Sequence, residues 1–94
     1  MELSKVEQLR QYLQAQMPGL AVRPNPDFDT RNWEFLFEKA GRIAYALVLT
    51  QQVLADNSVG EIITELEAQD WKGALDILQS RPLVLTSRGF QLAA

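Results

Sequence analysis

The stretch WEFLFEKAGRIAYALVL, residues 33 to 49, decides the fold of this chain. Large apolar side chains occupy every second position in both halves of the stretch, at Trp33, Phe35 and Phe37 and then at Ile43, Tyr45, Leu47 and Leu49. A repeat of two is typical of β-strands, whose successive side chains point to opposite faces of a sheet. The stretch therefore predicts two antiparallel strands joined by a tight turn, with the aromatic rings gathered on one face.

The turn sets the register of this hairpin. A two-residue turn, Ala40-Gly41, and a three-residue loop, residues 39–41, both fit the spacing. We favour the three-residue loop because such loops need a left-handed residue at their last position, where Gly41 stands. In that register Phe37 lies opposite Ile43. The alternative interpretation is that residues 42–55 form a buried helix, because a short apolar run also satisfies a helical wheel.

Helices are predicted on both sides of the hairpin. A capping-box pattern at Ser4 and an apolar stripe place the first helix at about residues 5–16, where Pro18 follows. A second capping box, beginning at Ser58, starts another helix. The apolar stripe changes direction near Asp70, which predicts a break there and a third helix from Trp71, with Asp70 as its cap.

Three further short segments have strand character. They are residues 20–23, residues 83–86 and residues 90–92, and the prolines after residue 23 place the first of them at the periphery of a sheet. With 94 residues, the chain is long enough for one modest core. We therefore predict a single α+β domain over residues 1–94. Its antiparallel sheet of three to four strands packs against helices on one face, in the order α-β-β-β-α-α-β.

The composition limits the chemistry. The chain contains no histidine and no cysteine, the residues that carry most acid/base, nucleophilic and transition-metal chemistry near neutral pH. The stretch Asn25 to Asp29 imitates the start of a calcium loop, but Thr30 stands where such a loop needs glycine. On a strand, the α-carbons of Glu34 and Glu38 lie about 13 Å apart, which is too far for a pair of catalytic carboxylates. We predict no enzyme, no metal site and no cofactor.

Charge is distributed unevenly along the chain. Residues 1–54 are neutral in sum, residues 55–80 carry a net charge of −5 and residues 81–94 carry +2. Within the acidic segment, Glu61 and Glu65 lie one helical turn apart and repel each other. Trp71, at the predicted break, is a large aromatic residue that either packs as a satellite of the core or anchors a binding partner. We therefore predict a partner-binding surface made of Glu61, Glu65, Glu67, Asp70 and Trp71.

The main hypothesis is a small, non-enzymatic interaction or regulatory module that binds a protein with a basic surface. The alternative is a domain that binds a small molecule or nucleic acid through its sheet, although an acidic chain disfavours nucleic acid. Apolar residues on both faces of the hairpin, Leu36 and Val48 among them, leave a homodimer open. No apolar run is long enough to span a membrane and no secretory signal is recognisable, so we expect a cytoplasmic location.

Overall fold

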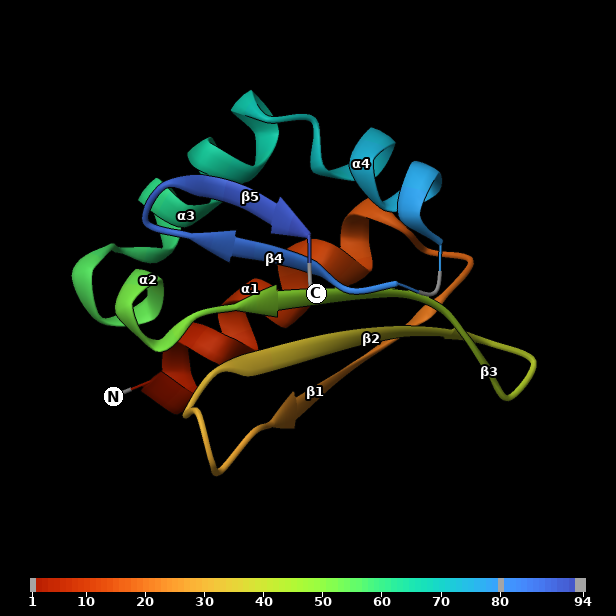
Figure 1. The fold of residues 1–94 in the computed structure, drawn as a ribbon. Coiled ribbons are helices and arrows are strands. Elements are labelled where there is room, and N and C mark those ends of the chain that lie inside the picture. Colours follow the sequence, from red (N-terminus) through yellow and green to blue (C-terminus); the bar gives the residue numbers. More distant parts are fainter. Residues whose placement is uncertain (1, 80, 93–94) are drawn as a thin grey trace.

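The structure is a computed structural model that describes residues 2–79 and 81–92, with the side chains of residues 4–79 and 81–89 among them. Helices and strands in this part of the chain follow one another in the order shown in Figure 1: α1 (Glu2–Gln16), β1 (Ala21–Pro26), β2 (Trp33–Lys39), β3 (Arg42–Leu49), α2 (Gln51–Asp56), α3 (Val59–Ala68), α4 (Trp71–Leu78), β4 (Leu83–Thr86) and β5 (Gly89–Leu92). The predicted α+β class and element order are confirmed, with the short helix α2 in addition. The strand character of residues 90–92 is confirmed in β5, which makes five described strands instead of the predicted three to four. The alternative of a helix over residues 42–55 is wrong, because residues 42–49 form β3.

The five described strands form one sheet in the order β1-β2-β3-β4-β5. Three of the four pairings are antiparallel, but β4 runs parallel to β3, with Leu85 beside Leu49. The sheet is therefore mixed, and the prediction of a purely antiparallel sheet needs this correction. The physical reason is the helical connection: α2, α3 and α4 carry the chain back to the starting end of β3, and such a crossover delivers the next strand in a parallel direction.

The β2–β3 hairpin places the predicted side chains on one face of the sheet, but its turn and its register differ from the predicted ones. Its turn contains two residues, Ala40 and Gly41, both with positive φ (53° and 78°), instead of the predicted three. A bulge then shifts the register, so that Phe37 pairs with Tyr45 and not with Ile43. A bulge adds one residue to one strand and so restores the alternation beyond it. The predicted gathering of aromatic residues on one face is confirmed, and the predicted register is wrong.

Helices cover one face of the sheet and leave the other face uncovered (Figure 1). Phe35, Phe37 and Leu47, on the covered face, have no exposed surface. They pack with the buried residues of all four described helices in one cluster, which includes Leu9, Leu54, Leu66 and Leu75. Burial of this apolar surface is the main stabilising contribution to the fold.

The helix ends follow local capping rules, with one exception. Helix α3 begins with the predicted capping box at Ser58, and α4 begins with the predicted cap at Asp70, whose carboxylate accepts a hydrogen bond from the Gly73 amide at 3.4 Å. Helix α1 begins at Glu2, so Ser4 lies inside its first turn and the predicted cap at Ser4 is wrong. Its hydroxyl instead accepts a hydrogen bond from the side chain of Gln8 at 3.3 Å.

Strand β1 lies at one edge of the sheet, as predicted, but extends through both of its prolines to Pro26. The amide of Val22 donates to the Gln14 side chain at 3.0 Å, so this amide points away from β2. Pro24 and Pro26 lie two and four residues further, on the same outward side, and have no amide hydrogen to offer. The outer edge of β1 therefore has no free donor at these three positions.

In the described part of the chain, every helix is too short or too polar to cross a lipid bilayer.

Candidate functional site

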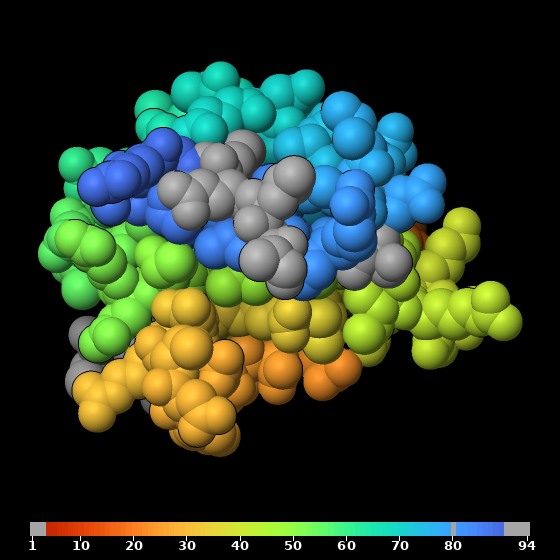
Figure 2. Space-filling view, in the orientation of Figure 1, coloured from red at the N-terminus to blue at the C-terminus, as the bar shows by residue number. Residues whose placement is uncertain are grey.

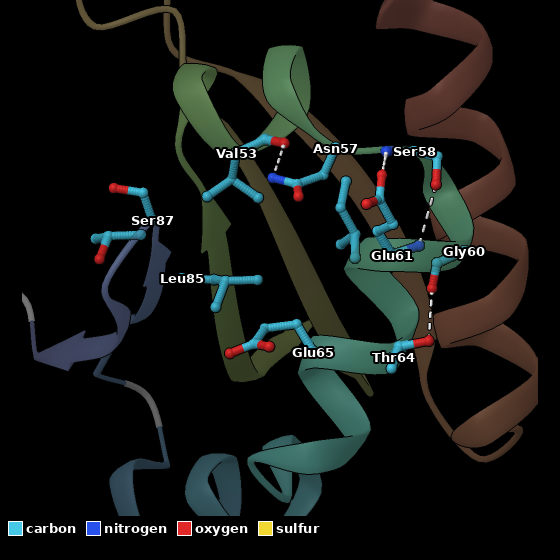
Figure 3. A pocket seen from close by; sticks show the side chains of 11 residues that line it. Val53, Asn57, Ser58, Gly60, Glu61, Thr64, Glu65, Leu85 and Ser87 are labelled. Atoms are coloured by element: carbon cyan, nitrogen blue, oxygen red, sulfur yellow. Dashed lines mark hydrogen bonds between the residues drawn. The ribbon is translucent and has the colours of Figure 1, made fainter.

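A hollow lies between helices α2 and α3 on one side and the end of β4 on the other (Figure 3). Its volume is about 670 Å³. It is lined by Val53, Asn57, Ser58, Gly60, Glu61, Ile62, Thr64, Glu65, Leu85, Thr86 and Ser87. We call this hollow the acidic cavity, because two of the five residues of the predicted partner-binding surface, Glu61 and Glu65, line it.

Glu61 is held in place by the first turn of α3. Its carboxylate accepts a hydrogen bond from the backbone amide of Ser58 at 2.8 Å, while the Ser58 hydroxyl accepts one from the Glu61 amide at 3.2 Å. The hydrogen bond from the Ser58 amide lowers the pKa of Glu61, and Lys5 adds a weaker electrostatic effect in the same direction. Glu61 is therefore a fixed negative charge at neutral pH, at the mouth of the acidic cavity.

Glu65 lies one turn further along the same face of α3, and Figure 3 shows its side chain reaching toward the space between α3 and β4. Its carboxylate accepts a hydrogen bond from the Gln69 side chain. Gln69 also lies against Gly89, where a β-carbon would come within 3.1 Å of the Gln69 amide oxygen. A residue larger than glycine at position 89 would therefore crowd the Gln69 side chain. This contact joins the end of α3 to the start of β5.

The opposite wall depends on the end of α2. Asn57, which follows this helix, donates from its side chain to the Val53 carbonyl at 3.0 Å. Lys5 reaches across from α1 and donates to the carbonyls of Leu54 and Asn57 at 2.7 and 2.9 Å. A positive charge at the carboxyl end of a helix is favourable, because unpaired carbonyl groups gather there. Lys5 thus holds α1 to the wall of the cavity, although it lies far from the cavity in sequence.

The chemistry of the acidic cavity suits cationic and hydrogen-bond-donating groups. Its lining carries two carboxylates and an apolar floor that includes Val53, Ile62 and Leu85, and no basic residue is among the lining residues. Two of its hydroxyl groups donate to backbone carbonyls: Thr64 donates to the Gly60 carbonyl at 2.8 Å, and Thr86 donates to the Gly89 carbonyl at 3.0 Å. Across the described residues, no three acidic side chains come together in a way that would hold a metal ion.

The other three residues of the predicted surface lie elsewhere. Glu67 accepts a hydrogen bond from the Tyr12 hydroxyl at 2.9 Å, and Tyr12 in turn accepts one from the Trp71 indole at 3.2 Å. Burial is the largest cause of a raised pKa at Tyr12. Asp70 caps α4. The structure therefore separates the predicted surface into the pair that lines the acidic cavity and a group around Tyr12.

Trp71 is not exposed. Only 1% of its surface is accessible, and its ring packs 6.0 Å from that of Tyr12 and 6.1 Å from that of Phe37, measured between ring centres. The expectation of an exposed aromatic anchor at this position is corrected by this burial. The reason is that Trp71 continues the buried stripe of α4, which includes Leu75 and Leu78.

Sequence reasoning missed the residues that complete the cavity, above all Asn57, Thr86 and Ser87. Asn57 and Ser58 form the short link between α2 and α3, while Thr86 and Ser87 belong to the turn between β4 and β5. The capping box identified Ser58 as a structural residue, but no local pattern indicates that these two turns face each other.

No family model, curated protein or solved structure matches this chain. The function proposed below therefore depends on the geometry and charge of the chain alone.

Proposed function

We propose that this protein is a non-enzymatic interaction module that binds a basic segment of another protein at the acidic cavity. The observation that carries this proposal is the position of Glu61 and Glu65, which line one hollow of about 670 Å³ together with neutral residues only. A lysine or arginine side chain entering this hollow would meet two negative charges and an apolar floor that suits its methylene groups.

The surrounding charge supports the same kind of partner. Residues 55–80 carry a net charge of −5, and Lys72 is the one basic residue among them. Lys72 is itself engaged, since its ammonium group donates to the Gln16 side chain at 2.9 Å. Complementary charge mainly increases the rate of encounter and the specificity for one kind of partner. A partner with clustered lysine or arginine residues is the kind that this surface would attract.

A small cationic molecule is the second candidate. The volume of the acidic cavity lies within the range of about 300 to 1,000 Å³ that is usual for small-molecule sites. Binding of a small molecule or a nucleic acid to the sheet is less well supported, because Phe35 and Phe37 have no exposed surface with which to stack on bases. The two carboxylates of the cavity would also repel phosphate groups.

Two further expectations from the sequence stay predictions. A homodimer through the uncovered face of the sheet would use Val48, which is partly exposed, whereas Leu36 and Ala46 on that face are already buried by neighbouring side chains. A cytoplasmic location rests on the composition, in particular on the lack of cysteine.

The test is a titration of the ¹⁵N-labelled protein, followed by NMR, with a synthetic peptide that alternates lysine and glycine and with a second peptide in which glutamine replaces lysine. We expect the lysine peptide to shift the amide resonances of residues 57–65 and 85–87. The double variant Glu61→Gln, Glu65→Gln should bind it about three- to thirtyfold more weakly, because each exposed charge pair contributes roughly 0.3 to 1 kcal/mol. Glutamine keeps the capping geometry at position 61.

The matched control is Glu7→Gln, Asp76→Asn, which removes two negative charges from α1 and α4 without touching the cavity. It should bind the lysine peptide almost as well as the wild type does. Equal weakening in both double variants would show that only the net charge matters and would contradict the proposed site. If spermidine shifts the amide resonances of the cavity residues and neither peptide does, the result would favour the small-molecule alternative.

A further inference from the structure

The loop between β1 and β2, residues 27–32, exposes a large aromatic side chain. Phe28 is 87% exposed, the highest value among the large hydrophobic side chains in the described ranges, with Ile77 at 80% and Ile43 at 45%. Figure 2 shows the loop, in orange, as a lobe that protrudes from the body of the molecule. A ring of this size that stays exposed does not gain the free energy of burial, unless a binding partner covers it.

The loop is held rigidly by its own hydrogen bonds. The Asp27 amide donates to the Asn32 carbonyl at 3.0 Å, and the Arg31 amide donates to the Asp27 carbonyl at 2.7 Å. The Asp27 carboxylate accepts from the Asp29 amide at 3.0 Å, while the Asn32 side chain accepts from the Gln51 amide at 2.9 Å. Phe28 is therefore presented on a fixed frame that is tied to the start of α2. A fixed frame reduces the entropy cost of binding.

A second hollow, of about 480 Å³, lies directly beside the ring. It is lined by Asn25, Pro26, Asp27, Phe28, Asp29, Asn32, Glu34 and Val48. Three of these residues are acidic and none is basic. Within the described part of the chain, the carboxylates of Asp29 and Glu34 have no hydrogen bond and no ion pair, although the charge of Arg23 acts on Glu34 from a distance.

The neighbouring edge of the sheet restricts how a partner can approach this hollow. Strand β1 offers no free amide on its outward side at Val22, Pro24 or Pro26, because the first is bonded to Gln14 and the prolines have none. A partner segment consequently cannot extend the sheet there by regular strand pairing. Because strand pairing is blocked there, the hollow beside Phe28 is the feature at this end of the molecule that a partner's side chain could enter.

We propose that Phe28 and the hollow beside it bind an arginine side chain of a partner protein. The flat guanidinium group would stack on the face of the Phe28 ring and donate hydrogen bonds to the carboxylates of Asp29 and Glu34. Arginine fits better than lysine, because its planar group combines stacking with several directed donors. A second copy of this chain fits less well, since its own hollow would bring the same negative charges. This proposal is independent of the function proposed for the acidic cavity.

The experiment is an NMR titration with the peptide acetyl-Gly-Arg-Gly-Arg-Gly-amide and with its citrulline counterpart, in which a neutral urea replaces each guanidinium group. We expect the arginine peptide to shift the ring resonances of Phe28 and the amide resonances of residues 27–34, and the citrulline peptide to shift them several-fold less. Phe28→Leu should weaken binding about two- to fivefold, because it keeps an apolar side chain but removes the ring. Ile77→Leu, an exposed apolar position on α4, should leave binding unchanged.

The variant Glu61→Gln, Glu65→Gln separates this proposal from the function proposed above, and it should leave the response of Phe28 unchanged. The proposal is overturned if both peptides shift Phe28 equally, or if Phe28→Leu binds the arginine peptide as tightly as the wild type does. It is also overturned if the Phe28 resonances move with protein concentration alone while sedimentation equilibrium shows a dimer, because a second copy would then occupy the surface.

Discussion

Strands β1 and β5 both form an edge of the sheet, and the outward edge of β1 is closed by a side chain of α1 and by prolines. Gln14 binds the outward amide of Val22, two prolines follow, and Arg23 pairs with Glu38 of the neighbouring strand at 2.9 Å. Strand β5, from Gly89 to Leu92, contains neither proline nor charge. The acidic cavity lies on the β5 side, beside the turn that leads into this strand.

The difference indicates that the two sides of the sheet do not contribute equally to stability. On the β1 side, three strands are joined by local turns, and β1 packs against α1. On the β5 side, β4 depends on a parallel pairing with β3 that only three residue pairs make. The β1 side is therefore expected to supply most of the stability, while the β5 side is joined to β3 by fewer residue pairs. The predictions below test this division, and the largest expected effect comes first.

Truncation of two paired leucines should show the largest contrast. Leu49 of β3 and Leu85 of β4 lie side by side and are both buried, but only Leu85 borders the acidic cavity. Leucine-to-alanine changes in cores cost about 2 to 5 kcal/mol, and the cost rises with the volume of closed void that remains. We expect Leu49→Ala to lower the free energy of unfolding by an amount near the upper end of this range. Leu85→Ala should lower it by at least about 1 kcal/mol less. Urea unfolding of both variants measures this difference, and an equal or reversed order would contradict the division.

The closure of the β1 edge should have an intermediate effect. Gln14→Leu removes the acceptor for the Val22 amide and the donor to the Leu20 carbonyl, a bond of 2.5 Å. Partly buried polar groups that lose their partner cost about 1 to 2 kcal/mol. The matched control, Gln11→Leu, changes an exposed residue of the same helix and should stay within about 0.5 kcal/mol of the wild type. Thermal and urea unfolding measure the stability of both variants. Similar losses of stability in Gln14→Leu and Gln11→Leu would contradict the role of Gln14 in closing the β1 edge.

The smallest effect concerns pH and compares one carboxylate from each side. On the β1 side, the hydrogen bond from Arg23 lowers the pKa of Glu38, and on the β5 side, the Ser58 amide lowers the pKa of Glu61. A group whose pKa is lower in the folded state stabilises the protein above its unfolded pKa, about 4.3 for glutamate. That stabilisation is lost as the pH falls through the folded pKa. Both contributions should therefore decline below about pH 4.3.

Salt distinguishes the two carboxylates. About 1 M NaCl shortens the screening length to roughly 3 Å, which weakens an exposed ion pair more than a hydrogen bond from the backbone. NMR titration of the side-chain carboxyl carbons should show the pKa of Glu38 rising with salt and that of Glu61 changing less. Arg23→Gln should raise the pKa of Glu38 and leave that of Glu61 unchanged, and Ser58→Ala should not affect the pKa of Glu38. A larger salt response at Glu61 would show that the two sides do not differ in this way.

Much of the β1 side could be predicted from the sequence, because its contacts are local. The alternation around Phe35 and Phe37 identified the strands and the buried face. The turn could not be predicted correctly, because Ala40 adopts a left-handed φ of 53° that glycine and asparagine usually take. The bulge that follows has no sequence signal of its own. It compensates for the shorter turn, so a wrong register still gave the right face.

The β5 side was less predictable, because its contacts join distant segments. The four-residue spacing of Glu61 and Glu65 placed both on one face of α3, and the structure confirms that face. The cavity depends on how far α3 stands from the turn after β4, which no local pattern encodes. The same is true of the parallel pairing, which follows from where three helices pack. The burial of Trp71 follows the local stripe of α4, whereas its ring contact with Tyr12 of α1 joins distant segments and has no sequence signal.

The parallel junction between β3 and β4 also has a consequence for the order of folding. Residues 50–82 separate the two strands, so a long loop must close before their hydrogen bonds form. The β1–β3 meander needs only short closures and is expected to assemble earlier. Strand β4 would then dock last, onto helices that are already in place. The acidic cavity would be the final part of this protein to be completed, and the first to open when the native state fluctuates.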